Sequence, residues 1–151
     1  MRYLDRLWTT FAGLFRKVTA RPDKGDSEAV RTDLPLARFL YTSRHFSTTR
    51  VRPSGFMPHS VRLDCSVSRT DDLSVEGTVE LGRKARPTET LRAWGQFVSR
   101  HIAEVSEDLS LVMDETSPRH GNILGWPADK ADQKAIAVEF TQRARLMMAP
   151  D

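Results

Sequence analysis

The sequence predicts an α+β domain, with a small mixed sheet of short strands and two or three helices, preceded by an amphipathic helix on a linker. Short apolar runs with a period of two residues occur beside segments with a period of 3.6 residues. The 151 residues, 39% of them hydrophobic and 28% charged, suffice for one hydrophobic core. The single cysteine, Cys65, excludes an internal disulfide framework and a cysteine-based zinc cluster.

An amphipathic helix is predicted over residues 1–19. Its charged residues interrupt any apolar run, which argues against a membrane-spanning helix and a secretory signal. We expect its apolar stripe to pack on a protein partner, a second copy or its own domain, with a membrane surface or an organellar transit peptide as alternatives. The stripe, which holds the candidate partner-binding residues, consists of Leu4, Leu7, Trp8, Phe11, Leu14, Phe15 and Val18.

Residues 20–35 predict an exposed linker, because they are polar, rich in proline and glycine, and without a sustained apolar period. The α+β domain is expected over residues 36–151. It begins with a predicted strand at 37–42 and a long polar loop at 43–60. Residues 61–68 alternate between apolar and polar side chains, which predicts a half-buried strand with the single cysteine in the core.

Two helices are predicted in the middle of the chain. Residues 73–84 fit a strand as well as a helix, and Ser74 as an N-cap favours the helix. Residues 88–106 predict a longer helix, with Thr88 as its N-cap. Its apolar residues have helical spacing and are Leu91, Trp94, Val98, Ile102 and Val105.

Two short strands and a closing helix are predicted at the end of the chain. The strands cover residues 109–113 and 122–126, and the helix covers residues 128–148 after Pro127. We expect Trp126 to be buried as an anchor for this helix. The buried stripe of the helix is expected to contain Ile136, Phe140, Ala144 and Met147.

Arginine residues gather between positions 38 and 69, where Asp64 is the only acid. Guanidinium and hydroxyl groups suit phosphate and carboxylate oxygens, so this segment is either an anion, nucleotide or RNA contact surface or a solvated loop. The net charge of only +3 and an acidic stretch at 103–115, which could pair with the arginines, weaken the case for a nucleic-acid binder. The candidate anion-binding residues are Arg38, Arg44, Ser47, Arg50 and Arg69.

His45 and His120 are the candidate acid–base residues. His45-Phe46-Ser47 matches half of the paired motif of two-histidine phosphoesterases, and no second copy completes it. The four histidines lack metal-ligand spacing, and the sequence contains neither a P-loop nor a dinucleotide-binding motif. We therefore expect no metal site and no cofactor. The lack of a complete catalytic constellation favours a non-enzymatic role.

Three segments together resemble a family of small bacterial hypothetical proteins. They are RFLYTSRHFSTTRVRPSGFMP, SVSRTDDLS and RHGNILGWPADKADQKAIAVEF, with an Arg-x-x-Tyr…His-Phe-Ser opening and a His-x-Asn-Ile-x-Gly-Trp-Pro segment. The resemblance covers roughly residues 36–148, departs at Gly121 where the family pattern has alanine, and implies no activity. It implies that one set of residues belongs together, namely Arg38, Tyr41, His45, Arg69, His120, Asn122 and Trp126.

Our first functional expectation is a non-enzymatic accessory protein that docks on a protein partner or assembly through residues 1–19. The first alternative is a small phosphate- or nucleotide-handling enzyme or binder that uses residues 38–69. The second is a nucleic-acid-contacting subunit of a larger assembly. We expect a cytoplasmic protein, located at a membrane surface if the N-terminal helix binds lipid.

Overall fold

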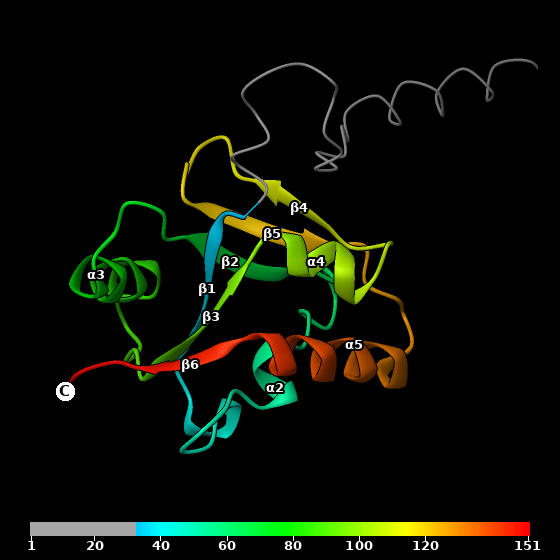
Figure 1. The fold of residues 1–151 in the computed structure, drawn as a ribbon, viewed down its shortest axis with the longest axis horizontal. Helices are drawn as coiled ribbons and strands as arrows, with labels where there is room; N and C mark the ends of the chain where they lie inside the picture. The colour runs from blue at the N-terminus through cyan, green and yellow to red at the C-terminus, as the bar shows by residue number, and fades with distance from the viewer. Residues whose placement is uncertain (1–32) are drawn as a thin grey trace, which may run out of the picture.

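The fold is that of a computed structural model, which describes residues 33–151 (Figure 1). The predicted amphipathic helix over residues 1–19 and the linker residues up to 32 lie outside the described part of the chain. The described part begins beside the sheet, because the main-chain N–H of Ser99 donates to the Leu34 carbonyl at 2.9 Å. The first strand already contains Pro35, which the sequence places in the linker.

Six strands form one sheet, in the spatial order β4-β5-β2-β1-β3-β6. Every neighbouring pair is antiparallel, so the sheet is not the mixed one expected from the sequence. The strands are β1 (Pro35–Leu40), β2 (Cys65–Arg69), β3 (Ala93–Val98), β4 (Ser110–Met113), β5 (His120–Leu124) and β6 (Arg145–Met148).

Four α-helices accompany the sheet in the described residues, and the α+β class is confirmed. Two of them are longer than six residues, and a side chain caps each of these two: Ser74 accepts from the Gly77 N–H and Asp129 accepts from the Asp132 N–H. The helices are α2 (Pro53–Phe56), α3 (Val75–Ala85), α4 (Arg100–Val105) and α5 (Lys130–Arg143), and a 3-10 turn, η2, covers Ser43–His45.

The main core lies between one face of the sheet and helices α2, α4 and α5. Phe56 of α2 stacks on Phe140 of α5 with ring centroids 5.2 Å apart, and Phe97 of β3 meets both rings edge-on. Cys65 and Trp126 are both buried in this core, as the sequence predicts. Burial also raises the pKa of the Cys65 thiol, which keeps it protonated and unreactive.

A second, smaller core lies on the opposite face, where α3 packs on β1 and β3. Figure 1 shows α3 apart from the other three helices. Gly82 permits this close approach, because a Cβ there would lie 2.8 Å from the ring of Phe39. Beyond α3, the same face of β2 and β5 carries polar side chains, which are Ser66, Ser68, His120 and Asn122.

The helix predicted over residues 88–106 is wrong, because Ala93–Val98 is strand β3 and only Arg100–Val105 is helical. β3 pairs with strands on both sides and is covered on both faces, so apolar residues occupy consecutive positions and hide the period of two. Trp94 faces the second core while Ala93 and Phe97 face the main one. The apparent helical spacing therefore joined Trp94 and Val98, on one face of β3, with Leu91 before the strand and with Ile102 and Val105 of α4.

The closing helix is shorter than predicted. It ends at Arg143, and Arg145–Met148 forms the edge strand β6 against β3. Phe140 lies in the main core, as expected, whereas Met147 packs against the second core on the other side of the sheet. Met147 therefore does not belong to the buried stripe of the helix, contrary to the prediction from the sequence.

Two smaller corrections concern residues 43–68. The polar loop at 43–60 contains η2 and α2, and α2 begins at Pro53, a favoured first residue of a helix. The strand predicted from residue 61 begins only at Cys65, and Val61 is 81% exposed. The His59 Nδ1 atom accepts from the Val61 and Arg62 main-chain N–H groups, which makes residues 59–62 a turn.

Candidate functional site

Strands β1 and β2 pair over only two residue pairs, and Arg38 occupies the opening where their pairing stops. Leu36 pairs with Arg69 and Ala37 with Ser68, but the register does not continue to the next residues. Instead, Arg38 Nη1 donates to the Ser66 carbonyl at 2.8 Å and Nε donates to the Gly55 carbonyl at 2.8 Å. The guanidinium is therefore held rigidly by two main-chain acceptors.

The charge of Arg38 has no carboxylate partner among residues 33–151. Its two acceptors are neutral carbonyls, and they use two of the five N–H groups of the guanidinium. A partly buried charge usually has an ionic partner, because desolvation of an unpaired charge is costly. Arg38 is therefore a fixed cation with three uncommitted donors.

A cavity of about 160 Å³ opens beside Arg38, on the face of the sheet that carries α3. By strand alternation Arg38 belongs to the opposite face, and it lines the cavity where the pairing of β1 and β2 has stopped. The other residues that line this cavity are Phe39, Tyr41, Ser66, Val67, Ser68, Ala85, Arg86 and His120. We refer to it as the Arg38 cavity.

Two serines from β2 contribute hydroxyl groups to the Arg38 cavity. Ser66 donates to the Asn122 side-chain oxygen on β5 at 3.2 Å and is thereby oriented. Ser68 is only 7% exposed, and no group in the described part of the chain forms a hydrogen bond with its hydroxyl. Ser68 lines the cavity, so its hydroxyl is a donor that a ligand there could use.

His120 of β5 also lines the cavity. In the sheet, β2 lies between β5 and the strand that carries Arg38. The His120 Nδ1 atom is 3.6 Å from the Asp114 carboxylate, beyond hydrogen-bond distance but close enough for electrostatic attraction. Asp114 is itself fixed by the Thr116 N–H at 2.9 Å and hydroxyl at 2.8 Å. These bonds from Thr116, with His120 as a smaller contribution, hold the pKa of Asp114 below its usual value.

Arg86 closes the cavity at the C-terminal end of α3. Its guanidinium carbon lies 5.1 Å from the centre of the Tyr41 ring, and its Nη1 is 3.3 Å from both carboxylate oxygens of Glu89. The Tyr41 hydroxyl donates to the Gly82 carbonyl at 2.6 Å, which fastens α3 to β1. Burial raises the pKa of Tyr41, although the charge of Arg86 acts in the other direction.

His45, in η2, lies close enough to Arg38 and Arg86 for their charges to affect its pKa. Burial, followed by the charges of Arg38 and Arg86, lowers the pKa of His45 from its usual value. His45 is not among the residues that line the cavity. It therefore belongs to the surroundings of the Arg38 cavity and reports on its electrostatic potential.

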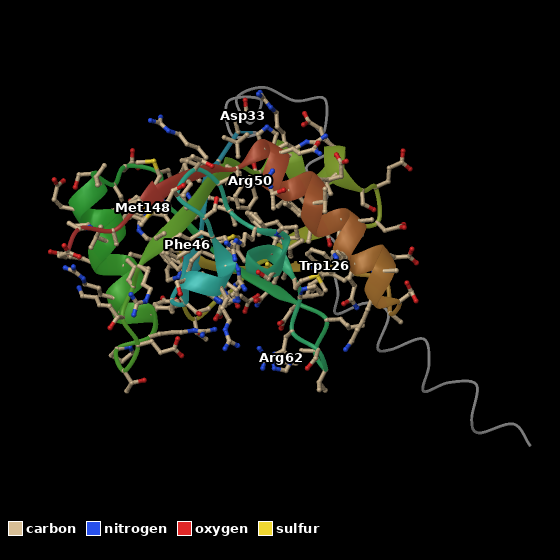
Figure 2. The ribbon with its side chains drawn as sticks, turned by 90° about the horizontal axis from the view of Figure 1, so that it is seen from below. Asp33, Phe46, Arg50, Arg62, Trp126 and Met148 are labelled. Carbon is tan, nitrogen blue, oxygen red and sulfur yellow. The ribbon has the colours of Figure 1, made fainter. Side chains whose placement is uncertain are left out.

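The remaining candidate anion-binding residues lie elsewhere. Arg44 and Arg50 are exposed, and Ser47 accepts from the Arg50 N–H within a tight turn. Arg69 forms a bidentate pair with Asp71, with bonds of 3.0 and 2.8 Å. Figure 2 shows Arg50 and Arg62 well separated on the molecule, so the arginines of residues 38–69 do not form one patch.

The acidic stretch at 103–115 does not pair with these arginines in the described structure. Its Glu104 lies near Arg100 and Arg143, and its Asp114 lies near His120. Residues 33–151 carry sixteen basic and sixteen acidic residues, so the net charge of +3 belongs to residues 1–32. An overall positive charge therefore does not draw anions to this domain, and the Arg38 cavity is a local feature.

A larger cavity of about 380 Å³ lies at the N-terminal end of α3, between that helix and β3. Its titratable lining residues are Asp71 and Asp72, and its polar groups bond to one another, as Gln96 does to Thr70 at 3.3 Å. Hydrogen bonds from Arg69 hold the pKa of Asp71 below its usual value. This lining opposes anion binding, so we regard the smaller Arg38 cavity as the candidate site.

The residues implied by the family resemblance divide between the two faces of the sheet. Arg38, Tyr41 and His120 line the Arg38 cavity, and Asn122 orients its Ser66 hydroxyl. Trp126 instead fills the main core, where its Nε1 donates to the Ile123 carbonyl at 3.0 Å.

Sequence reasoning did not select Ser68 and Arg86 as site residues. The alternation of residues 61–68 does place Ser66 and Ser68 on the polar side of a strand, which is the signal that could have indicated them. Arg86 has no comparable signal, because it joins the site through the packing of α3.

No group of three or more histidine, cysteine, aspartate or glutamate side chains in residues 33–151 has the geometry of a metal site. A comparison with known protein families, curated proteins and solved structures finds no match for this chain. The candidate partner-binding residues of the N-terminal stripe, Leu4 to Val18, lie outside the described residues.

Proposed function

We propose that the domain binds a small anionic ligand, with the anionic group in the Arg38 cavity. One observation carries the proposal: the Arg38 guanidinium is fixed by two neutral carbonyls, without a carboxylate partner in the described structure, in a residue that lines a cavity together with Ser68. A bound phosphate or carboxylate group would accept from the Arg38 guanidinium and offset the cost of its partial desolvation. Arg86 and His120 would supply further donors from the cavity wall.

A purely structural role for Arg38 explains less. If the guanidinium only bridged the two strands, a neutral amide could donate to the same carbonyls without the cost of a partly buried charge. Burial is the main cause of the lowered pKa of His45, and the further contributions of Arg38 and Arg86 support a local positive potential. Such a potential in a confined space suits an anion.

The test is a titration of the full-length protein with inorganic phosphate and with acetate, followed by amide NMR at constant ionic strength. We expect the largest shifts at Ser68, His120 and Arg86. Arg86→Gln should weaken binding about tenfold, the loss of one charge-assisted hydrogen bond. Arg50→Gln is the matched control, because it removes the same charge from an exposed site outside the cavity. Equal weakening by both variants would refute a specific site.

The accessory role through residues 1–19 stays a prediction, since the described structure begins at residue 33. It is compatible with an anion-binding domain, because the two functions would use different parts of the chain. Removing residues 1–19 should then abolish partner or vesicle association and leave anion binding unchanged. In residues 33–151, no helix is long and apolar enough to cross a membrane.

A further inference from the structure

The Arg38 cavity surrounds its contents with single donors from four different elements. Arg38 comes from β1, Ser68 from β2, His120 from β5 and Arg86 from the end of α3. A planar carboxylate presents two oxygens, and its preferred partner is the two-pronged fork of one guanidinium. Donors that converge from several directions instead match a group whose oxygens point in several directions.

Arg69 and Asp71 show how this chain binds a carboxylate. Arg69 grips Asp71 with Nε and Nη2 together, one bond to each carboxylate oxygen. In Arg38 this fork is not available, because Nε already donates to Gly55. The N–H groups that remain lie on its two terminal nitrogens and can meet two oxygens of a carboxylate or of a phosphoryl group, so the other donors of the cavity decide between the two.

The charges that face the cavity favour a doubly charged group. Arg38 and Arg86 are cations, and no carboxylate-bearing residue lines the cavity. Glu89 offsets part of the charge of Arg86, and His45 stands within the field of both arginines. A phosphomonoester carries nearly two negative charges above a pH of about 6, compared with one for a carboxylate or a phosphodiester.

The size of the cavity limits what enters it. Pockets that enclose a drug-sized ligand have volumes of about 300–1,000 Å³, whereas the Arg38 cavity has about 160 Å³. It therefore accommodates a phosphoryl group and leaves the rest of the molecule outside. A phosphodiester would need room for a second substituent inside the cavity.

From the donors of four elements, the charges of the two arginines and the size of the cavity, we infer that the Arg38 cavity binds the terminal phosphoryl group of a phosphomonoester. This inference rests on the proposed function and specifies its ligand class. Arg38, Ser68, Arg86 and His120 bind different oxygens of the phosphoryl group. The organic part of the ligand extends away from the sheet.

The experiment compares three small probes that share a methyl group: methyl phosphate, dimethyl phosphate and acetate. Each is titrated into the full-length protein at constant ionic strength and at a pH above the second ionisation of the monoester. We expect methyl phosphate to bind at least about tenfold more tightly than either of the others. We also expect Ser68→Ala to weaken methyl phosphate binding and leave acetate binding nearly unchanged.

The outcomes separate this inference from the function on which it rests. If acetate or dimethyl phosphate binds in the cavity as tightly as methyl phosphate, the domain is an anion binder but the phosphomonoester inference is wrong. If none of the three probes shifts the resonances of Ser68 and His120, the proposed function itself fails. Circular dichroism and thermal unfolding of the Ser68→Ala protein check that its fold is intact.

Discussion

Arg38 donates from Nη1 to the carbonyl oxygen of Ser66 at 2.8 Å, across the point where strands β1 and β2 cease to pair. A side chain thus takes the place of a ladder hydrogen bond in the centre of the sheet. The same residue lines the cavity on the α3 side. Arg38 therefore both stabilises the sheet and lines the candidate binding site. Experiments must separate its effect on stability from its effect on ligand binding.

Arg38→Met is expected to destabilise the domain by about 2 kcal/mol, because two carbonyls lose charged donors at a partly buried position. Urea unfolding measures this directly. Arg44→Met is the matched control, since Arg44 is exposed and outside the cavity, and it should change the unfolding free energy by less than about 0.5 kcal/mol. Equal stability of the two variants would show that the Arg38 bonds contribute nothing to the fold.

Ser68→Ala should behave in the opposite way. Its hydroxyl has no hydrogen-bond partner in the described structure, so its removal should alter the unfolding free energy by less than about 0.5 kcal/mol. Phosphate affinity should fall about tenfold, because a bond to a charged acceptor is lost. A variant that unfolds easily and binds normally would assign Ser68 a structural role instead.

Glu89→Gln is expected to tighten anion binding, because Glu89 competes with a ligand for Arg86. The ion pair is exposed, so its loss should cost between zero and about 1 kcal/mol of stability. Isothermal titration calorimetry of the variant beside Arg86→Gln gives the comparison. Affinity changes of the same sign in both variants would contradict a direct role for Arg86.

The stability of the domain should fall as the pH drops through the histidine range, with a contribution from His45. Burial and the charges of Arg38 and Arg86 lower its pKa in the folded state, so the unfolded chain takes up the proton first. The contribution is present above the usual histidine pKa of about 6.5 and is lost towards the lower folded value. His45→Gln should flatten this part of the pH profile of urea unfolding.

The same histidine offers a readout of ligand binding. An anion in the Arg38 cavity offsets the charges of Arg38 and Arg86, so it should raise the pKa of His45 towards its usual value. Imidazole NMR titration with and without phosphate measures the change. A His45 pKa that phosphate leaves unchanged would place the anion elsewhere.

The sequence predicted correctly those elements that a short stretch of residues specifies, such as a helix with an N-cap. Ser74 as an N-cap indicated α3, and its hydroxyl does accept from Gly77 at 3.0 Å. β3 was missed because it is covered on both faces, which removes the alternation that identifies a half-buried strand. β6 was missed because Met147 continues a helical spacing that the chain abandons after residue 143.

The candidate site could be predicted only in part. Arg38 and His120 stood out by residue type and neighbours, whereas Ser68 and Arg86 became relevant through the opening between β1 and β2 and the position of α3. Strand pairing and helix packing are long-range contacts, which no local pattern specifies. Arg44 and Arg50 were predicted to bind an anion because they are close to Arg38 in the sequence, but neither of them lines the cavity.

Side-chain NMR of the guanidinium of Arg38, in the full-length protein with and without methyl phosphate, tests anion binding at this residue most directly. We expect the free N–H groups of Arg38 to shift and exchange more slowly when the ligand is added. The shifts should saturate together with those of the Ser68 and His120 amides. Saturation of the amide shifts with the Arg38 resonances unchanged would contradict an anion site at Arg38.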